Sequence, residues 1–148
     1  MRLALDSNIL VYAEGVNGPD HQASALRILK MLPGYEIFVP VQILSEVFNV
    51  LTRKAGYSTS RAREAVLGWR YSFHHIETTE AVLLRGMDLV VDHRLGLWGS
   101  LVVAAAAEAA CVLLLTEDMQ DGFLWGGVTI ANPFAKTLHP MLAGILRS

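Results

Sequence analysis

Cysteine is nearly absent from this sequence of 148 residues, and charged side chains are few. Its one cysteine, Cys111, lies inside an apolar run, which excludes an internal disulfide and a cysteine metal site. The chain has 12 Lys and Arg against 14 Asp and Glu, and its net charge of -2 gives no overall positive field for holding nucleic acid. Any contact with nucleic acid must therefore use a local patch.

A long apolar run is also missing. The most apolar stretch, residues 101–115, is interrupted by Glu108 and is too short to span a membrane. Only Leu3, Ala4 and Leu5 precede Asp6, whereas a secretory signal needs an apolar stretch of roughly 7 to 15 residues. Together with the lone cysteine, these features predict a cytoplasmic protein without membrane contact.

Apolar residues are what the chain does have. They make up 53% of the sequence, with a mean hydropathy of +0.38, and this excludes disorder caused by high charge and low hydrophobicity. The length fits one domain, which we expect to cover residues 1–148, with about 133–148 as a C-terminal tail.

Short apolar runs alternate with helical patterns along the chain. The helical patterns begin near residues 9, 19, 40, 59, 81 and 99, and the predicted strands cover 2–5, 36–39, 75–77, 111–115 and 128–131. This alternation predicts an α/β fold with a mainly parallel central sheet flanked by helices. Such sheets place their binding sites beyond the carboxyl ends of the strands.

Two acidic residues stand at predicted strand ends, and a third lies in a helix. Asp6 follows the first strand, Asp118 follows the strand at 111–115, and Glu46 falls at the border of the apolar face of the helix from Pro40 to Lys54. Each has an ordinary interpretation: Asp6 as a helix cap, Glu46 as a solvated acid and Asp118 as part of a turn.

Taken jointly, the three acids describe an oxygen-ligand site for a hard divalent cation, Mg²⁺ or Mn²⁺. The five histidines have no ligand spacing with cysteine, so a zinc site is not indicated. Gly126-Gly127 lacks the Lys and Ser or Thr that would follow in a phosphate-binding loop.

Four blocks of the sequence together resemble the PIN domain. They occur in the family's order and spacing and span nearly the whole chain: Asp6-Ser7-Asn8, Ser45-Glu46-Val47 with Asn49, Leu97-Trp98 before the run from Leu101 to Ala106, and Leu115-Thr116-Glu117-Asp118-Met119. The likeness is closest to the toxin nuclease of VapBC-type toxin–antitoxin pairs.

The resemblance implies a metal-dependent endoribonuclease that is inhibited by a small antitoxin. It implies that Asp6, Glu46 and Asp118 are the catalytic metal ligands, with Glu117 as a possible substitute ligand. Asn8 and Thr116 would then fix the carboxylates through hydrogen bonds.

One position departs from the family pattern. Where the family ordinarily has Asp after Trp, this chain has Gly99, either as a natural loss or as an introduced change. Gly99 and Ser100 are ordinary residues at the start of a helix, and we expect them to open the alanine-rich helix there. Because a ligand position is empty, we expect weak or no nuclease activity.

A basic stripe is the candidate RNA-binding surface. Between residues 53 and 70 there is one acid, Glu64, against Arg53, Lys54, Arg61, Arg63 and Arg70. Such a stripe can follow a phosphate backbone, or it can be an ordinary solvated helix face.

Three functions remain open at this level. The first is a metal-dependent endoribonuclease toxin, and the second is a noncatalytic PIN-fold module that binds RNA or an antitoxin. The third is a phosphoacceptor signalling domain, which is disfavoured because no Lys follows the strand at 111–115 closely.

The chain holds more apolar residues than one small core should need, and this predicts a homodimer. The surplus consists of Trp69, Trp98 and Trp125 and of an apolar tail with Phe134, Leu138, Met141, Leu142, Ile145 and Leu146. The alternative is that the tail folds back onto its own core.

Overall fold

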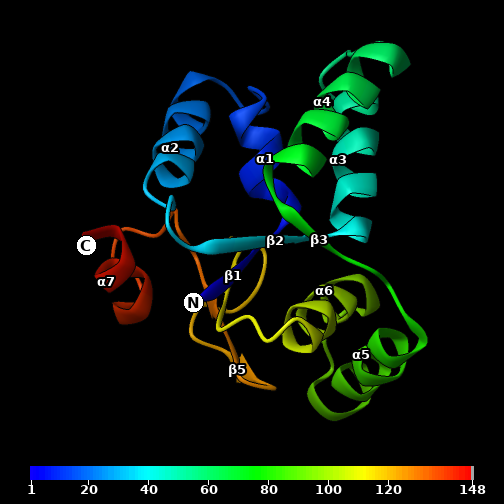
Figure 1. Cartoon of the computed structure of the whole chain (residues 1–148), viewed down its shortest axis with the longest axis vertical. Coiled ribbons are helices and arrows are strands. Elements are labelled where there is room, and N and C mark those ends of the chain that lie inside the picture. Colours follow the sequence, from blue (N-terminus) through cyan, green and yellow to red (C-terminus); the bar gives the residue numbers. More distant parts are fainter. Residues whose placement is uncertain (148) are drawn as a thin grey trace.

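A six-stranded sheet forms the centre of the computed structural model, which describes residues 1–147 (Figure 1). The strands lie in the order β3-β2-β1-β4-β6-β5, and all neighbours are parallel except the antiparallel pair β5 and β6. Their bounds are β1 (Arg2–Leu5), β2 (Glu36–Pro40), β3 (His74–Ile76), β4 (Leu113–Leu115), β5 (Leu124–Trp125) and β6 (Val128–Ala131).

Helices cover both faces of the sheet. In Figure 1, α1 to α4 lie above the sheet, and α5 and α6 lie below it. Their bounds are α1 (Ser7–Ala13), α2 (Pro19–Lys30), α3 (Val41–Arg53), α4 (Thr59–Ser72), α5 (Glu80–His93), α6 (Leu97–Glu108) and α7 (Pro140–Arg147). Within residues 1–147, none of these helices combines the length and the apolar character needed to cross a bilayer.

The central strands are apolar throughout because helices shield them on both faces. Leu3 and Leu5 of β1 and all three leucines of β4 are fully buried. Helix α6 has little polar surface because it packs between α5 and the sheet, and its residues 100–106 are buried. Close packing of α5 on α6 occurs at Gly86, where an added Cβ would lie 2.8 Å from Cδ2 of Leu101.

Strand β1 is where the chain switches from one side of the sheet to the other. From β1 the chain adds β2 and β3 on one side, and it then crosses to place β4 on the other side of β1. Leu5 pairs with Leu115 in register, and the backbone N–H of Asp6 donates to the carbonyl of Leu115 (3.0 Å). The residues that follow these two strands are therefore held side by side at a topological switch point, where ligands bind in folds of this type.

The structure confirms the predicted α/β fold with its mainly parallel sheet. The sequence analysis missed β5, because two residues are too short to show a periodic pattern. Gly126 and Gly127 form the turn between β5 and β6 with φ values of 57° and 81°. Positive φ at both positions is what a tight hairpin turn requires, so these glycines are explained by the backbone.

The start of α6 corrects the prediction for Gly99. The helix begins at Leu97 with Gly96 as its N-cap, so Gly99 is its third residue and does not open it. The prediction treated Gly and Ser as helix-starting residues, but Gly96 already supplies the extended backbone that precedes the first turn. Position 99 is consequently on the first turn of a formed helix.

The C-terminal tail folds back onto the core of its own chain. Leu142 and Ile145 are 0% and 5% exposed, and Phe134, Leu138 and Leu146 pack against buried residues. The tail is therefore not a free apolar surface, and the part of the homodimer prediction that rested on it is wrong.

Helix α5 does expose large apolar side chains, those of Leu83, Leu84, Met87 and Val91.

Candidate acidic site

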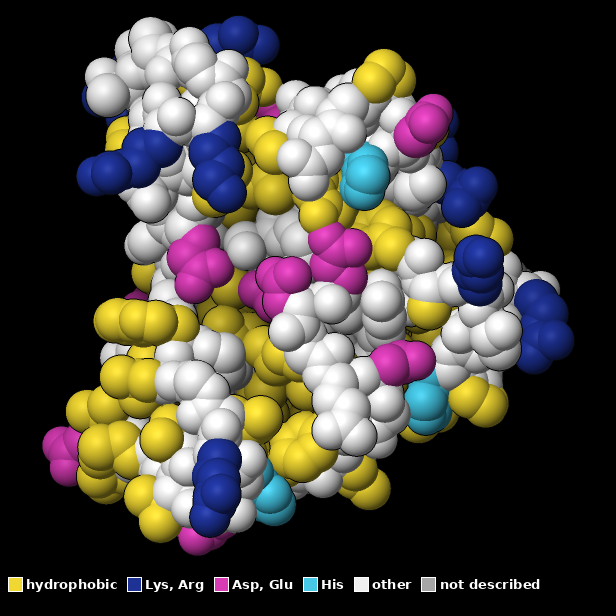
Figure 2. Space-filling model, turned by 180° about the vertical axis from the view of Figure 1, so that it is seen from behind, with side chains coloured by type: hydrophobic (Ala, Val, Ile, Leu, Met, Phe, Trp, Pro, Cys, Tyr) yellow, Lys and Arg dark blue, Asp and Glu magenta, His cyan; other side chains and the backbone are white. Residues whose placement is uncertain are grey.

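Three carboxylates line one cavity of about 440 Å³ beyond the carboxyl ends of β1 and β4. Asp6 follows β1, Asp118 follows β4, and Glu46 reaches the cavity from α3. Figure 2 shows acidic side chains gathered in a hollow at the middle of this face of the molecule. The three residues that the sequence analysis selected are thus brought together by the fold.

Asp6 is both a helix cap and a buried carboxylate. Its side chain accepts a hydrogen bond from the N–H of Ser7 (2.7 Å) at the start of α1, as the capping interpretation predicts. Asp6 is nevertheless only 5% exposed and lines the acidic cavity. The capping and ligand interpretations are therefore compatible with each other.

Thr116 and Asn8 connect the two strand-end acids. Thr116 Oγ1 donates to Asp6 Oδ2 (2.7 Å) and accepts from Asn8 Nδ2 and from the N–H of Asp118 (3.1 Å each). Asn8 Nδ2 also donates to Asp118 Oδ2 (3.1 Å). The hydroxyl of Thr116 thus uses its one donor and both acceptor positions, which fixes the direction of every bond in this network.

One oxygen in this network has no partner among the described residues. Asn8 Oδ1 is buried and accepts no hydrogen bond from residues 1–147. A buried acceptor of this kind is costly unless water, an ion or another donor satisfies it. Its presence beside two carboxylates is compatible with a hydrated cation site.

The pKa of the Asp6 carboxyl is raised to about 6. Burial is the main cause, and the charges of Glu46 and Asp118 add to it, while the hydrogen bonds from Thr116 and Ser7 act in the opposite direction. In residues 1–147 none of the three acids forms a salt bridge with Lys or Arg. A cation would therefore neutralise carboxylate charges that no Lys or Arg among the described residues pairs with.

The donor set fits a hard cation, although it does not form a finished coordination sphere. All candidate donors are oxygens, which Mg²⁺ and Mn²⁺ prefer. Within residues 1–147, however, no three His, Cys, Asp or Glu side chains approach closely enough to make a preformed metal cluster. The carboxylates share a cavity without converging on one point.

Position 99 lies in the same cavity and is partly covered by Met119. A Cβ built on Gly99 would lie 3.2 Å from Met119 Cε and 3.8 Å from its sulfur. Both atoms belong to the far end of a flexible side chain, which can move by a few tenths of an ångström. The backbone therefore accepts a side chain at position 99, and Met119 takes part of the space that it would need.

Glu117 does not line the acidic cavity, although the sequence analysis offered it as a substitute ligand. The hydroxyl of Tyr12 donates a hydrogen bond to its carboxylate. Burial, followed by this bond to Glu117, raises the pKa of Tyr12 to about 12. Because Tyr12 stays protonated at neutral pH, it holds Glu117 beside α1.

Two contacts at the cavity were not predicted from the sequence. Trp98 lines the cavity, and its backbone carbonyl accepts a hydrogen bond from Gln42 Nε2 (3.2 Å). The sequence placed Trp98 in a motif but gave it no role. Gln120 also lines the cavity, and no sequence signal marked it.

The predicted basic stripe lies outside the acidic cavity. Arg53 and Lys54 are exposed at the end of α3, and Arg61 and Arg63 are exposed on the first turns of α4. The guanidinium of Arg61 stacks over the ring of Tyr57, with its carbon 3.8 Å from the ring centroid. In Figure 2, Lys and Arg side chains lie on the lobe above the acidic hollow.

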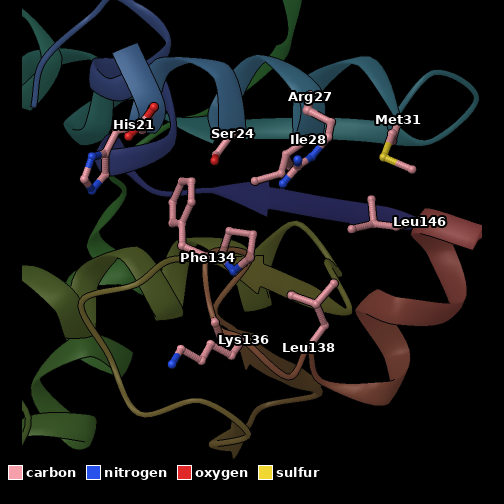
Figure 3. A pocket seen from close by; sticks show the side chains of 12 residues that line it. His21, Ser24, Arg27, Ile28, Met31, Phe134, Lys136, Leu138 and Leu146 are labelled. Atoms are coloured by element: carbon pink, nitrogen blue, oxygen red, sulfur yellow. The ribbon is translucent and has the colours of Figure 1, made fainter. Parts of the chain in front are cut away.

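A second cavity, of about 560 Å³, lies between α2 and the C-terminal tail (Figure 3). Its walls include the apolar side chains of Ile28, Phe134 and Leu138 and the cationic side chains of Arg27 and Lys136. It is larger than the acidic cavity, and the described residues that line it include one carboxylate, that of Asp20. It therefore does not repeat the cluster of three acids.

Comparison with known proteins identifies the fold. A family model described as the PIN domain matches residues 3–120. A search of curated proteins found no significant match.

Similar solved structures cover most of this chain. They include VapBC2 from Rickettsia felis bound to a DNA fragment from their promoter (TM-score 0.69, 17% identity, 89% of this chain and 98% of that chain). A toxin–antitoxin complex from Klebsiella pneumoniae is also similar (TM-score 0.67, 20% identity, 89% and 98%). A third is VapC20 from Mycobacterium tuberculosis, a sarcin-ricin loop cleaving toxin (TM-score 0.64, 14% identity, 76% and 86%). At these identities, the likeness shows a shared fold.

The raised pKa of Asp6 predicts a pH-dependent cost in stability. Since its folded-state pKa of about 6 exceeds the ordinary value of 3.8 for an aspartate, protonation stabilises the folded chain below about pH 4, and this contribution is lost as the pH rises through 6. The loss corresponds to roughly 3 kcal/mol. Asp6→Asn mimics the protonated form, so thermal unfolding in EDTA should show its stability relative to the original chain increasing from pH 4 to pH 7.5.

Asp121→Asn is the control for this measurement, because Asp121 is exposed and lies outside the acidic cavity. Its stability should follow that of the original chain across the same pH range. Parallel pH profiles for Asp6→Asn and the original chain would contradict the raised pKa.

Proposed function

This chain belongs to the PIN domain family, and we propose that it is a metal-dependent endoribonuclease, the toxin of a type II toxin–antitoxin pair. The observation that carries the proposal is the cavity lined by Asp6, Glu46 and Asp118 beyond the β1 and β4 strand ends. The reaction is hydrolysis of an RNA phosphodiester bond. VapC20, one of the similar solved structures, is described as a toxin that cleaves the sarcin-ricin loop.

Asp6, Glu46 and Asp118 are the proposed ligands of Mg²⁺ or Mn²⁺. Bound there, a divalent cation neutralises negative charge on the phosphodiester and activates water for hydrolysis. Thr116 and Asn8 are the proposed positioning residues, because their hydrogen bonds hold the carboxylates of Asp6 and Asp118. Disturbing such partners typically costs ten- to a hundredfold in metal affinity or activity.

Asp6 must be ionised to act as a ligand, and its raised pKa makes this dependent on pH. Near pH 6 about half of the Asp6 carboxyls are protonated when no cation is present. A bound cation would favour the ionised carboxylate against the burial and the charges of Glu46 and Asp118, which raise its pKa. Cation binding should accordingly strengthen as the pH rises through 6.

The missing carboxylate at position 99 is proposed to weaken this site. Glycine offers no ligand there, Met119 occupies part of the space, and the described acids do not form a preformed metal cluster. The same observations favour a second candidate function, a noncatalytic PIN-fold module that binds RNA or an antitoxin. Restoring a carboxylate at position 99 distinguishes the two.

Exposed cations on α3 and α4 are the proposed contacts for the RNA backbone: Arg53, Lys54, Arg61 and Arg63. They lie outside the cavity, so they would hold phosphates away from the cleavage point. In Figure 2, the lobe that bears Lys and Arg borders the acidic hollow. An RNA strand bound to this lobe would therefore extend toward the carboxylates.

A small antitoxin and a second copy of the chain are the proposed protein partners, in the cytoplasm. Similar solved structures from three bacteria are toxin–antitoxin or VapBC assemblies, which supports an antitoxin partner. Helix α5 supports a homodimer, because Leu84 and Val91 are 50% and 79% exposed two helical turns apart on the same face. An exposed apolar stripe of this kind is typical of an interface.

The nuclease proposal predicts that Gly99→Asp increases RNA cleavage in Mg²⁺ or Mn²⁺ by at least about tenfold. This is the lower end of the range of effects on activity that changes to residues around a metal typically have. The added carboxylate supplies a charge and oxygens to a cation that takes about six oxygen ligands. Cleavage of one RNA by both proteins, with and without EDTA, measures the effect.

Gly99→Asn is the matched control, because it adds a side chain of the same size without the charge. It should gain much less activity than Gly99→Asp, and Asp6→Ala in the Gly99→Asp background should abolish the gain. If the Gly99→Asp protein cleaves no RNA in a broad panel, the noncatalytic module is the better function.

The homodimer proposal predicts a species of twice 16.2 kDa in light scattering at micromolar concentration. The double substitution Leu84→Asp with Val91→Asp places charges on the α5 stripe and should give a monomer. Leu124→Asp, at a position that is 64% exposed on β5, should stay dimeric. A 16 kDa species from the unsubstituted chain would contradict the dimer.

A further inference from the structure

Trp98 combines high exposure with a place in the acidic cavity. Its residue exposure is 66%, and it lines the same cavity as Asp6, Glu46 and Asp118. A single exposed apolar residue is ordinary on a protein surface. An indole beside three carboxylates is different, because that cavity is where the proposed reaction takes place.

The backbone of Trp98 is held close to the helix that carries Glu46. It is the second residue of α6, after the N-cap Gly96, and its carbonyl accepts the hydrogen bond from Gln42 Nε2. Gln42 stands on α3 one turn before Glu46, so this bond joins the first turn of α6 to the helix that carries a carboxylate. The indole is therefore attached to a rigid part of the site.

The acidic cavity has an electrostatic difficulty with an RNA substrate. The described residues that line it include three carboxylates and no Lys or Arg. These carboxylates repel phosphates, and the exposed cations of α3 and α4 lie outside the cavity. A cation at the proposed site would offset part of this repulsion, and a contact that does not depend on charge would add affinity next to the carboxylates.

We propose that Trp98 is a stacking platform for an unpaired base of the RNA, next to the bond that is cleaved. This inference rests on the proposed function and deepens it by naming a residue that would contact the substrate beside the carboxylates. Aromatic side chains hold unpaired bases by stacking, whatever the base is. Bases inside a duplex are already stacked and paired, so a duplex cannot use the indole in this way.

An apolar surface of a protein is the other occupant that an exposed indole could accept. Covering Trp98 with such a surface would also cover the carboxylates around the cavity, and burying them without a partner is costly. A nucleobase is small and has polar edges, so it can stack on the indole without burying the carboxylates. The placement of Trp98 therefore favours RNA.

The test measures binding of a fluorescently labelled single-stranded RNA of mixed sequence, and of its duplex, by anisotropy in EDTA. Trp98→Leu keeps an apolar side chain but removes the aromatic face, and it should raise the Kd for the single strand by about fivefold or more, with little change for the duplex. Trp98→Phe should retain most of the affinity. Leu124→Ala, at a similarly exposed apolar position, should have no effect.

Two further readouts keep the alternatives apart. If Trp98→Leu binds the single strand as tightly as the original chain, stacking is wrong, while metal-dependent cleavage by both proteins would leave the proposed function intact. If Trp98→Leu instead changes only the mass in light scattering, Trp98 belongs to a protein interface and the inference fails. If the original chain neither binds nor cleaves RNA in Mg²⁺ or Mn²⁺, the proposed function fails together with the inference.

Discussion

The pairing of β1 with β4 is the constraint on which the candidate site depends. Register between Leu5 and Leu115, extended by the hydrogen bond from the Asp6 N–H, places the two strand ends side by side. Asp6 and Asp118 are 112 positions apart in the sequence and would not meet without it. Thr116 then connects their side chains, so backbone pairing and side-chain bonding act at the same place.

This arrangement places like charges together, and the protein does not neutralise them with its own cations. The described lining of the cavity contains no Lys or Arg, and burial, together with the charges of Glu46 and Asp118, raises the pKa of Asp6 to about 6. Such a site is costly in stability, which is typical of functional sites. Compared with the Asp that the family ordinarily has there, Gly99 would leave a bound cation with less negative charge to offset and with one ligand fewer.

The sequence predicted the fold well because its signals were local and repeated. Buried strands appeared as apolar runs, and an acid after each of two runs was enough to place Asp6 and Asp118 on the same edge of a parallel sheet. The start of α6 and the two-residue β5 were not predicted, and the folded-back tail was left open as the alternative to a dimer interface. Each depends on tertiary packing or on backbone angles that leave no periodic pattern in the sequence.

Contacts between distant side chains were the least predictable part of the site. Nothing near Tyr12 in the sequence indicates that its hydroxyl binds Glu117, and nothing near Gln42 indicates its bond to Trp98. Hydrogen bonds from Asn8 and Thr116 were expected only because a family resemblance supplied the partners.

Calorimetric titration of Mn²⁺ into the chain is the direct test of the proposed cation site. We expect one Mn²⁺ site, for which Mg²⁺ competes. The affinity for Mn²⁺ should be at least about tenfold weaker in Asp6→Ala and unchanged in Asp121→Asn. Absence of Mn²⁺ binding, or equal binding by Asp6→Ala, would contradict the proposed site.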